Sequence, residues 1–145
     1  MPKLLLFDNI DEPGLATLPV YERRGGYQSL RKALSMSRED VLQQLLDSNI
    51  RGRGGAGFPT GRKISFLPKG DMQKYLVCNA DESEPGTFKD RELMQKSPHM
   101  LVEGVMIAAY AGNISKAFIY VRGEYQHQAA LVEQAKAALG NAAAA

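Results

Sequence analysis

Two short apolar segments separated by a long apolar helix constrain the fold of this chain most strongly. The segments are KYLVCNA, residues 74–80, and KAFIYVRG, residues 116–123. The length and apolar content of each predict a strand, and the first is expected to be buried. Between them, SPHMLVEGVMIAAYAG predicts a helix with Ser97 as N-cap, Pro98 at the first position and Gly112 after the end. A strand, a helix and a strand in this order predict a right-handed crossover and a parallel strand pair.

Further helices are expected on both sides of this unit. EYQHQAALVEQAKAAL, residues 124–139, predicts a helix after the second strand, so the order becomes βαβα. SREDVLQQLLDSNI predicts a helix that begins after Ser37 as N-cap, with Asp40 three residues further on. GGYQSLRKAL predicts a short helix after Gly26, whereas residues 1–24 contain three prolines and are expected to be irregular. The fold class is therefore α/β: N-terminal helices, a glycine-rich loop and a βαβα unit with a parallel strand pair.

Composition excludes several classes of function. The 145 residues fit one domain, and 44% apolar residues are enough to fill its core. A net charge of +2 from charges of mixed sign does not indicate a general nucleic-acid-binding surface. The single cysteine, Cys78, excludes an internal disulfide and a multi-cysteine metal site, and it is expected to be inert core within its strand. No apolar run approaches the roughly 20 residues that span a bilayer.

The run RGRGGAGFPTGRK contains five glycines and four positive charges in residues 51–63. Three of its glycines match the GxGxxG of dinucleotide-binding folds, but they follow a helix, and FPTG is expected to break rather than begin one. The phosphate-loop spacing fails, because the first required glycine falls at Ala56. A single RGRGG is shorter than the repeated tracts of RNA-binding proteins. Two interpretations remain: a loop whose backbone N–H groups approach an anion closely, and a purely structural loop.

A polar segment, NADESEPGTFKDR, follows the first predicted strand, and residues 81–91 are expected to form a loop. Ligands of α/β sheets bind beyond the carboxyl ends of strands, so Asn79, Asp81, Glu82 and Glu84 lie where a ligand would lie. An asparagine can pair with the edge of a heterocycle, and carboxylates can accept hydrogen bonds from sugar hydroxyls. The alternative is a solvated acidic turn before a helix.

Together, RGRGGAGFPTGRK, YLVCNADESEPGTFKDR, PHMLVEGVMIAAYA and YVRGEY closely resemble the NADH-oxidising, FMN-binding flavoprotein subunit of respiratory complex I, an NADH:quinone oxidoreductase. Diaphorase subunits of NAD-reducing hydrogenases and of NAD-dependent formate dehydrogenases share the pattern, which covers residues 24–139. The resemblance implies a Rossmann-like fold without the standard Rossmann fingerprint. It also implies that residues 1–36 are an N-terminal extension with a short helix, and that residues 37–145 are the N-terminal part of the FMN/NADH-binding domain.

The resemblance implies roles for individual residues. The glycine loop, residues 52–57, would line the FMN and nucleotide cavity. Arg53 and Lys63 would help to hold FMN. Phe58 and Phe66 would stack on the NADH adenine, and Glu84 would bind NADH hydroxyls. Asn79, Asp81 and Glu82 would contact the flavin. The implied cofactor-binding residues are Gly52, Arg53, Gly54, Gly55, Ala56, Gly57, Phe58, Lys63, Phe66, Asn79, Asp81, Glu82 and Glu84.

The implied reaction is hydride transfer from nicotinamide C4 to flavin N5, followed by electron transfer to iron–sulfur clusters and on to quinone. FMN and NAD(H) are the implied cofactors and supply the chemistry, so no catalytic acid, base or metal ligand is expected in this chain. His99 and His127 are expected to be structural or solvated. The implied partners are a 2Fe–2S thioredoxin-like subunit and other subunits of a redox complex at the inner face of the bacterial membrane, in the cytoplasm, with no nucleic acid and no direct membrane insertion.

Members of the resembled family continue beyond the pattern found here. They add a second glycine-rich segment with paired glutamates that completes the FMN pocket, a ubiquitin-like domain, and a helical domain whose four cysteines hold a 4Fe–4S cluster. This chain contains none of these segments, and its closing alanines are expected to be a tail. The alternatives to an NADH dehydrogenase subunit are a diaphorase subunit, a module that binds a nucleotide or a partner without turnover, and an RNA-binding tract.

Overall fold

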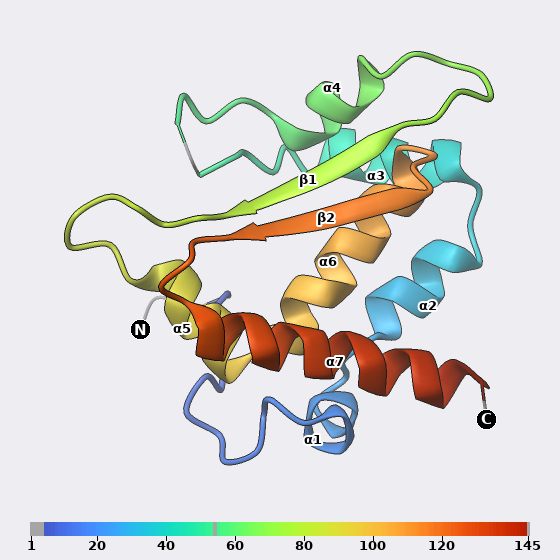
Figure 1. Ribbon diagram of the computed structural model, residues 1–145. Coiled ribbons are helices and arrows are strands. Elements are labelled where there is room, and N and C mark those ends of the chain that lie inside the picture. The colour runs from blue at the N-terminus through green and yellow to red at the C-terminus, as the bar shows by residue number, and fades with distance from the viewer. Residues whose placement is uncertain (1–4, 54, 145) are drawn as a thin grey trace.

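The computed structural model describes residues 5–53 and 55–144 of the chain. Two strands, β1 (Tyr75–Ala80) and β2 (Lys116–Val121), pair in parallel, with Tyr75 opposite Lys116 and Ala80 opposite Val121. Helix α6 (Pro98–Ala111) lies in the crossover between them and α7 (Gln126–Ala144) follows β2, which confirms the predicted βαβα order (Figure 1).

The N-terminal helices are α1 (Leu18–Arg23), α2 (Gln28–Leu34) and α3 (Arg38–Asp47). The predicted cap of α3 is confirmed, because the Ser37 hydroxyl accepts a hydrogen bond of 3.1 Å from the backbone N–H of Asp40. The prediction that residues 1–24 are irregular was wrong for α1. Its proline lies in the first helical turn, where a proline is tolerated because that N–H has no helical acceptor.

Two further helices were not predicted. Helix α4 (Thr60–Ser65) begins directly after Pro59, so the expectation that FPTG breaks a helix was wrong. Gly61 within α4 is buried against α3, and a Cβ at this position would lie 2.6 Å from the backbone carbon of Leu45. This glycine therefore permits the close approach of α3 and α4.

Helix α5 (Lys89–Lys96) begins inside the segment expected to be a polar loop. At the other end of the chain, residues 142–144 continue α7 instead of forming a separate tail, in keeping with the high helix propensity of alanine, and Ala145 lies outside the described residues. Within residues 5–53 and 55–144, no helix is both long and apolar enough to cross a membrane.

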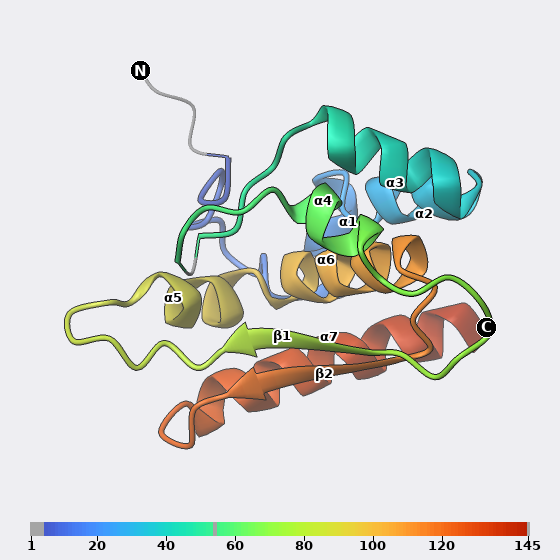
Figure 2. The same cartoon turned by 90° about the horizontal axis from the view of Figure 1, so that it is seen from above.

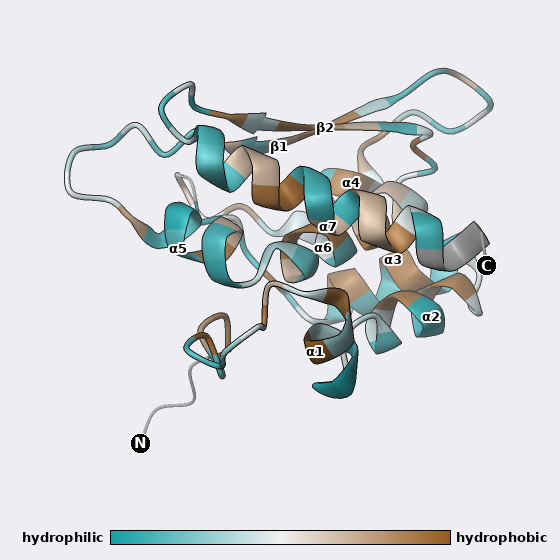
Figure 3. Cartoon of the chain, turned by 60° about the horizontal axis from the view of Figure 1, so that its bottom comes forward, coloured by the Kyte–Doolittle hydropathy of each residue, from teal (hydrophilic) through white to brown (hydrophobic). Residues whose placement is uncertain are grey.

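The main core lies between the strand pair and helices α5, α6 and α7. Figures 2 and 3 show the helices on one side of the two strands, with α4 beside β1 and away from β2. Only one face of the strands turns toward this core, and Ala80 is the one residue of β1 that is buried, so the prediction that residues 74–80 form a buried strand was largely wrong. The outer face carries Tyr75, Val77, Phe118 and Tyr120, which are all exposed.

A second core region joins the N-terminal helices to α6 through buried polar groups. The Glu103 carboxylate accepts hydrogen bonds from the Tyr21 hydroxyl at 2.5 Å and from the backbone N–H groups of Tyr27 and Leu30 at 2.9 and 3.0 Å. The Tyr27 hydroxyl is 2.8 Å from Nδ1 of His99. His99 is buried and bonded within this cluster, in the structural position that was expected for it.

Candidate functional site

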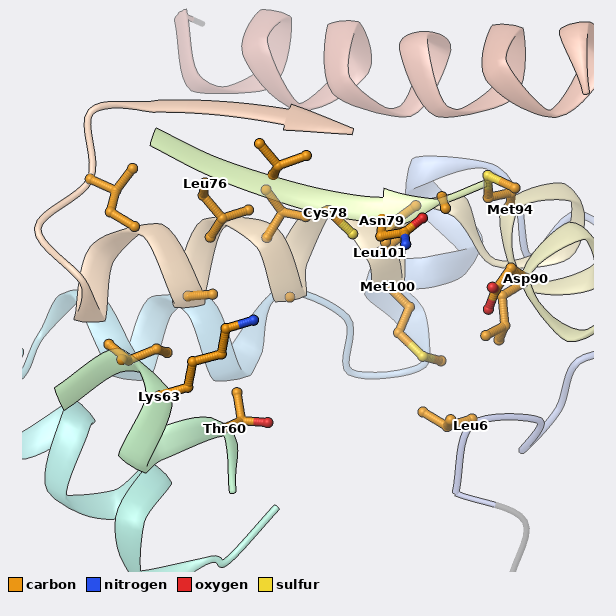
Figure 4. Close-up of a pocket in the computed structure, with 18 of the residues that line it drawn as sticks. Leu6, Thr60, Lys63, Leu76, Cys78, Asn79, Asp90, Met94, Met100 and Leu101 are labelled. Atoms are coloured by element: carbon orange, nitrogen blue, oxygen red, sulfur yellow. The ribbon is translucent and has the colours of Figure 1, made fainter. Parts of the chain in front are cut away.

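A cavity of about 750 Å³ lies between β1, α4, α5 and α6 (Figure 4). Its volume is within the range of small-molecule sites, roughly 300–1,000 Å³. Most of its wall is apolar and comes from both sides, including Ile64, Leu67, Leu76, Met100, Leu101 and Val105. The polar side chains in the wall are Thr60, Lys63, Asn79, Asp90 and Ser97. The arrangement suits a flat apolar ligand that carries a few polar groups.

Lys63 and Asn79 are the predicted site residues that this cavity brings together. Lys63 extends from α4 into the cavity, and Asn79 stands at the carboxyl end of β1 across from it (Figure 4). The side-chain oxygen Oδ1 of Asn79 accepts a hydrogen bond of 3.0 Å from the backbone N–H of Asp81. The side-chain nitrogen Nδ2 is therefore the remaining polar group of this side chain. A cation and an amide donor at an apolar cavity can hold an anionic group and the acceptor edge of a ring.

The glycine loop forms a closed turn between α3 and α4. Arg51 and Pro59 make an isolated antiparallel bridge, and the backbone N–H of Gly52 donates to the Phe58 carbonyl at 3.0 Å. Gly57 has φ +69°, a left-handed conformation that favours glycine. The predicted site residue Gly54 lies outside the described residues. Of the described loop residues Gly52, Arg53, Gly55, Ala56 and Gly57, none lines the cavity, so their cofactor role stays a prediction.

Phe58 and Phe66 lie at the two ends of α4 and form an exposed aromatic pair. Their ring centroids are 6.2 Å apart at an interplanar angle of 50°, and the residues are 49% and 66% exposed. Exposed rings present a flat apolar face that is suited to stacking on a planar ligand. The predicted adenine stacking requires such exposure.

The acidic segment after β1, residues 81–84, contains three acidic side chains. Two of them face solvent and one is buried. Asp81 accepts a hydrogen bond from the Ser83 hydroxyl, and Glu84 is exposed. Glu82, in contrast, has a fully buried carboxylate that accepts from the backbone N–H groups of Asp90 at 2.6 Å and Arg91 at 2.8 Å. These N–H groups belong to the first turn of α5, where a negative charge is favourable. The contacts of Glu82 are those of a structural anchor.

The sequence reasoning missed Thr60, Asp90 and Ser97 as cavity residues. Thr60 lies in RGRGGAGFPTGRK and Asp90 lies in NADESEPGTFKDR, so membership of these motifs could have identified both residues. Ser97 was expected to cap α6, but its side chain makes no cap bond, and its buried hydroxyl has no hydrogen-bond partner among the described residues. Cys78 also lines the cavity, and burial raises the pKa of its thiol, which keeps the thiol protonated. Within the described part of the chain, no group of three His, Cys, Asp or Glu side chains could hold a metal ion.

Comparisons with known proteins place these features in a family. The model of the Nuo51 FMN-binding domain matches residues 45–144. An NADH-quinone oxidoreductase subunit of Rhizobium meliloti is 52% identical over 133 residues, which are 90% of this chain and 32% of the relative. The corresponding NADH-quinone oxidoreductase subunit of Escherichia coli is 49% identical over 111 residues, or 74% of this chain and 25% of the relative.

The fold has a similar counterpart among solved structures. An NAD⁺-reducing [NiFe]-hydrogenase in the air-oxidised state superposes with a TM-score of 0.73 and 36% identity, over 97% of this chain and 23% of the hydrogenase chain. The H₂-reduced state of such a hydrogenase gives a TM-score of 0.70 and 38% identity. This chain therefore spans between about a fifth and a third of the length of the proteins that it resembles.

Proposed function

The chain belongs to the Nuo51 FMN-binding domain family, and on that premise we propose that it forms the FMN- and NADH-binding part of an NADH-oxidising subunit. The matched region, residues 45–144, includes the glycine loop, the acidic segment and all of the cavity-lining residues except Leu6. Relatives at about 50% identity are named as subunits of NADH-quinone oxidoreductases, which supports a role in oxidoreduction.

The observation that carries the proposal is the pair Lys63 and Asn79 on opposite sides of the apolar cavity at the carboxyl end of β1. FMN combines an apolar ring, whose edge carries hydrogen-bonding groups, with a ribityl phosphate. The apolar wall fits the ring, the Lys63 ammonium fits the phosphate or the ribityl chain, and the Asn79 amide fits the ring edge. The residues present therefore fit the cofactor.

The remaining predicted residues complete the proposed site. Backbone N–H groups of the glycine loop approach the nucleotide phosphates, and Arg53 adds positive charge. Phe58 and Phe66 stack on the adenine, while Asp81 and Glu84 accept hydrogen bonds from hydroxyl groups. FMN held by these residues would supply hydride acceptance from NADH and one-electron transfer to iron–sulfur clusters and on to quinone. The protein contributes binding and orientation, which need no catalytic acid or base.

We also propose the wider context of the chain. Residues 1–36 form an N-terminal extension, and residues 37–145 are the N-terminal part of the FMN/NADH-binding domain. The extension packs on that domain through the contacts of Glu103 with Tyr27 and Leu30. The electron-accepting partner is a 2Fe–2S thioredoxin-like subunit, within a redox complex on the cytoplasmic face of a bacterial membrane.

A diaphorase subunit is the second candidate function. The observation that favours it is the superposition on the NAD⁺-reducing hydrogenase, which covers 97% of this chain and therefore includes most of the N-terminal extension. The two candidates share the NADH and FMN site and differ in the final electron acceptor.

The test is a flavin titration of the purified chain, followed by anaerobic addition of NADH. We expect FMN fluorescence to be quenched on binding, and NADH to bleach the flavin absorption. Lys63→Met is expected to raise the FMN dissociation constant about tenfold, because a charge-assisted contact is worth roughly 1.5–3 kcal/mol. Lys136→Met on the surface of α7 is the matched control and is expected to leave it unchanged. A colourless chain that takes up no FMN contradicts flavin binding by these residues alone, and bound FMN that NADH does not bleach supports a module without turnover.

A further inference from the structure

We propose that Arg122, in the loop after β2, is a positioning residue that fixes the conformation of the loop after β1, which joins two parts of the cavity wall. The loop, residues 81–88, joins the last residue of β1, Ala80, to helix α5, and Ala80 and Asp90 on its two sides line the cavity. The proposal rests on the proposed function for its effect on FMN, but the contact itself is structural and can be tested without the cofactor.

The strand pair brings the two loops together. Ala80 and Val121 are partners at the carboxyl ends of β1 and β2, so the chain leaves both strands side by side. Arg122 reaches across this end of the sheet, and its Nη1 donates a hydrogen bond of 3.1 Å to the backbone carbonyl of Glu82. Residues 40 positions apart in the sequence are joined by this bond.

The Arg122 guanidinium is itself held in place by its neighbours. Its Nε and Nη2 donate to the two carboxylate oxygens of Glu124 at 3.1 and 2.8 Å, in a bidentate pair. These hydrogen bonds hold the pKa of Glu124 at about 2. The guanidinium carbon also lies 5.3 Å from the centre of the Tyr125 ring. An arginine fixed in this way presents its third nitrogen in one direction, which a lysine ammonium cannot do.

Glu82, whose carbonyl accepts the hydrogen bond from Arg122, has a backbone conformation that requires support from its surroundings. Glu82 has φ +48°, a left-handed conformation that a residue other than glycine keeps only where its surroundings determine it. Its carboxylate is bonded to the first turn of α5 through Asp90 and Arg91, and the Tyr125 hydroxyl is 3.4 Å from the same carboxylate. Arg122 therefore secures the backbone of Glu82, while α5 secures its side chain.

The effect of Arg122 reaches the cavity in two short steps. The carbonyl that it binds belongs to the residue after Asp81, and the backbone N–H of Asp81 donates to the Asn79 side chain at 3.0 Å. That hydrogen bond determines which way the Asn79 amide faces. If Arg122 is lost, Glu82 can leave its left-handed conformation, and the amide of Asn79 loses its fixed orientation toward the cavity.

The first experiment measures backbone hydrogen exchange in the whole chain without flavin, for the wild type, Arg122→Lys and Arg122→Gln. We expect the amides of Asp81, Asp90 and Arg91 to exchange roughly tenfold faster in both variants, while amides of α3 keep their rates. Arg31→Lys is the matched control, because Arg31 also pairs with a glutamate but lies on α2, outside the cavity wall. Glu124→Gln is the second variant, for use if an Arg122 variant does not fold. It keeps the arginine and weakens the pair that holds it, so the same amides should exchange faster than in the wild type, but by less than in the Arg122 variants.

The second experiment titrates the same proteins with FMN and records the visible circular dichroism of the bound flavin, which reports the asymmetry of its surroundings. We expect Arg122→Lys to bind FMN about tenfold more weakly and to change the flavin signal, with an unchanged melting temperature. A purely structural role would move the melting temperature and leave the signal of bound flavin as it is.

The outcomes separate the two proposals. Unchanged exchange of Asp81, Asp90 and Arg91 in the Arg122 variants overturns the positioning role, and so does faster exchange with unchanged FMN affinity and flavin signal. A wild-type chain that binds no FMN contradicts the proposed function, and the exchange rates alone then decide whether Arg122 holds the loop.

Discussion

The charged side chains of Glu103 in α6 and Lys63 in α4 have different surroundings. Glu103 is buried and accepts three hydrogen bonds from the N-terminal helices. Lys63 extends into the cavity, and its ammonium has no acidic partner among the described residues. Buried polar groups are normally paired within a protein, whereas polar groups that face a cavity are available to a ligand.

The comparison extends to the aromatic residues of the two regions. Tyr21 and Tyr27 pack edge to face with ring centroids 5.2 Å apart, and both hydroxyls have partners in the buried cluster. Phe58 and Phe66 contact each other at the surface and remain about half or more exposed. The first region is therefore expected to determine stability, and the second to determine binding.

The largest effect on stability is expected when Glu103 is removed. Glu103→Leu leaves the Tyr21 hydroxyl and the N–H groups of Tyr27 and Leu30 without their acceptor, which should lower the free energy of unfolding by about 3 kcal/mol. Urea denaturation measures this loss. Glu133→Leu on the exposed face of α7 is the control, with an expected change below about 0.5 kcal/mol. Similar losses in the two variants would break the comparison.

Gly61→Ala is expected to have the next largest effect. The added Cβ would lie 2.6 Å from the backbone of Leu45, so α3 and α4 must separate, at a cost of about 1–3 kcal/mol. Gly140→Ala in α7 is the matched control, since a Cβ there meets nothing within 4 Å, and it should stabilise the protein by about 1 kcal/mol. Thermal unfolding compares the two, and a neutral Gly61→Ala would mean that the α3–α4 contact can relax.

A smaller effect is expected from acidification, through His99. Burial lowers the pKa of His99 in the folded protein below its value of about 6.5 in the unfolded chain, so the unfolded chain binds the proton more readily. The free energy of unfolding should therefore be constant above pH 7 and should fall as the pH decreases below about 6.5. Denaturation between pH 5 and 8 tests this for the wild type, His99→Gln and the exposed His127→Gln. The slope should disappear only in the first variant, and its persistence there would assign it to other groups.

The smallest effect is expected on the outer face of the strand pair. Tyr120 is 62% exposed, so Tyr120→Thr should change the free energy of unfolding by no more than about 0.5 kcal/mol. Sedimentation of the same samples reports whether copies of the chain associate through this face. A large loss of stability that depends on protein concentration would show that the face is covered in solution.

Prediction from the sequence succeeded where the signal was local. The helix that begins after Ser37, the parallel strands and the helix with Pro98 at its start each follow from residue spacing, capping and apolar pattern. Helices α1, α4 and α5 were missed because short helices have weak periodicity, and the proline and glycine of FPTG normally indicate a break. Lys63 and Asn79 line one cavity, and their role in cofactor binding stays a prediction, whereas the buried anchoring contacts of Glu82 were not foreseen.

The sequence by itself determined the family and the order of the βαβα unit, because these follow from contiguous motifs. The tertiary structure alone decided which of the acidic side chains are used internally. Glu103 meets Tyr27 across 76 positions and Arg122 meets Glu82 across 40, and no local pattern encodes contacts of that length. Burial decides the outcome, because a carboxylate removed from water must find donors within the protein, while one that remains at the surface keeps its capacity for a ligand.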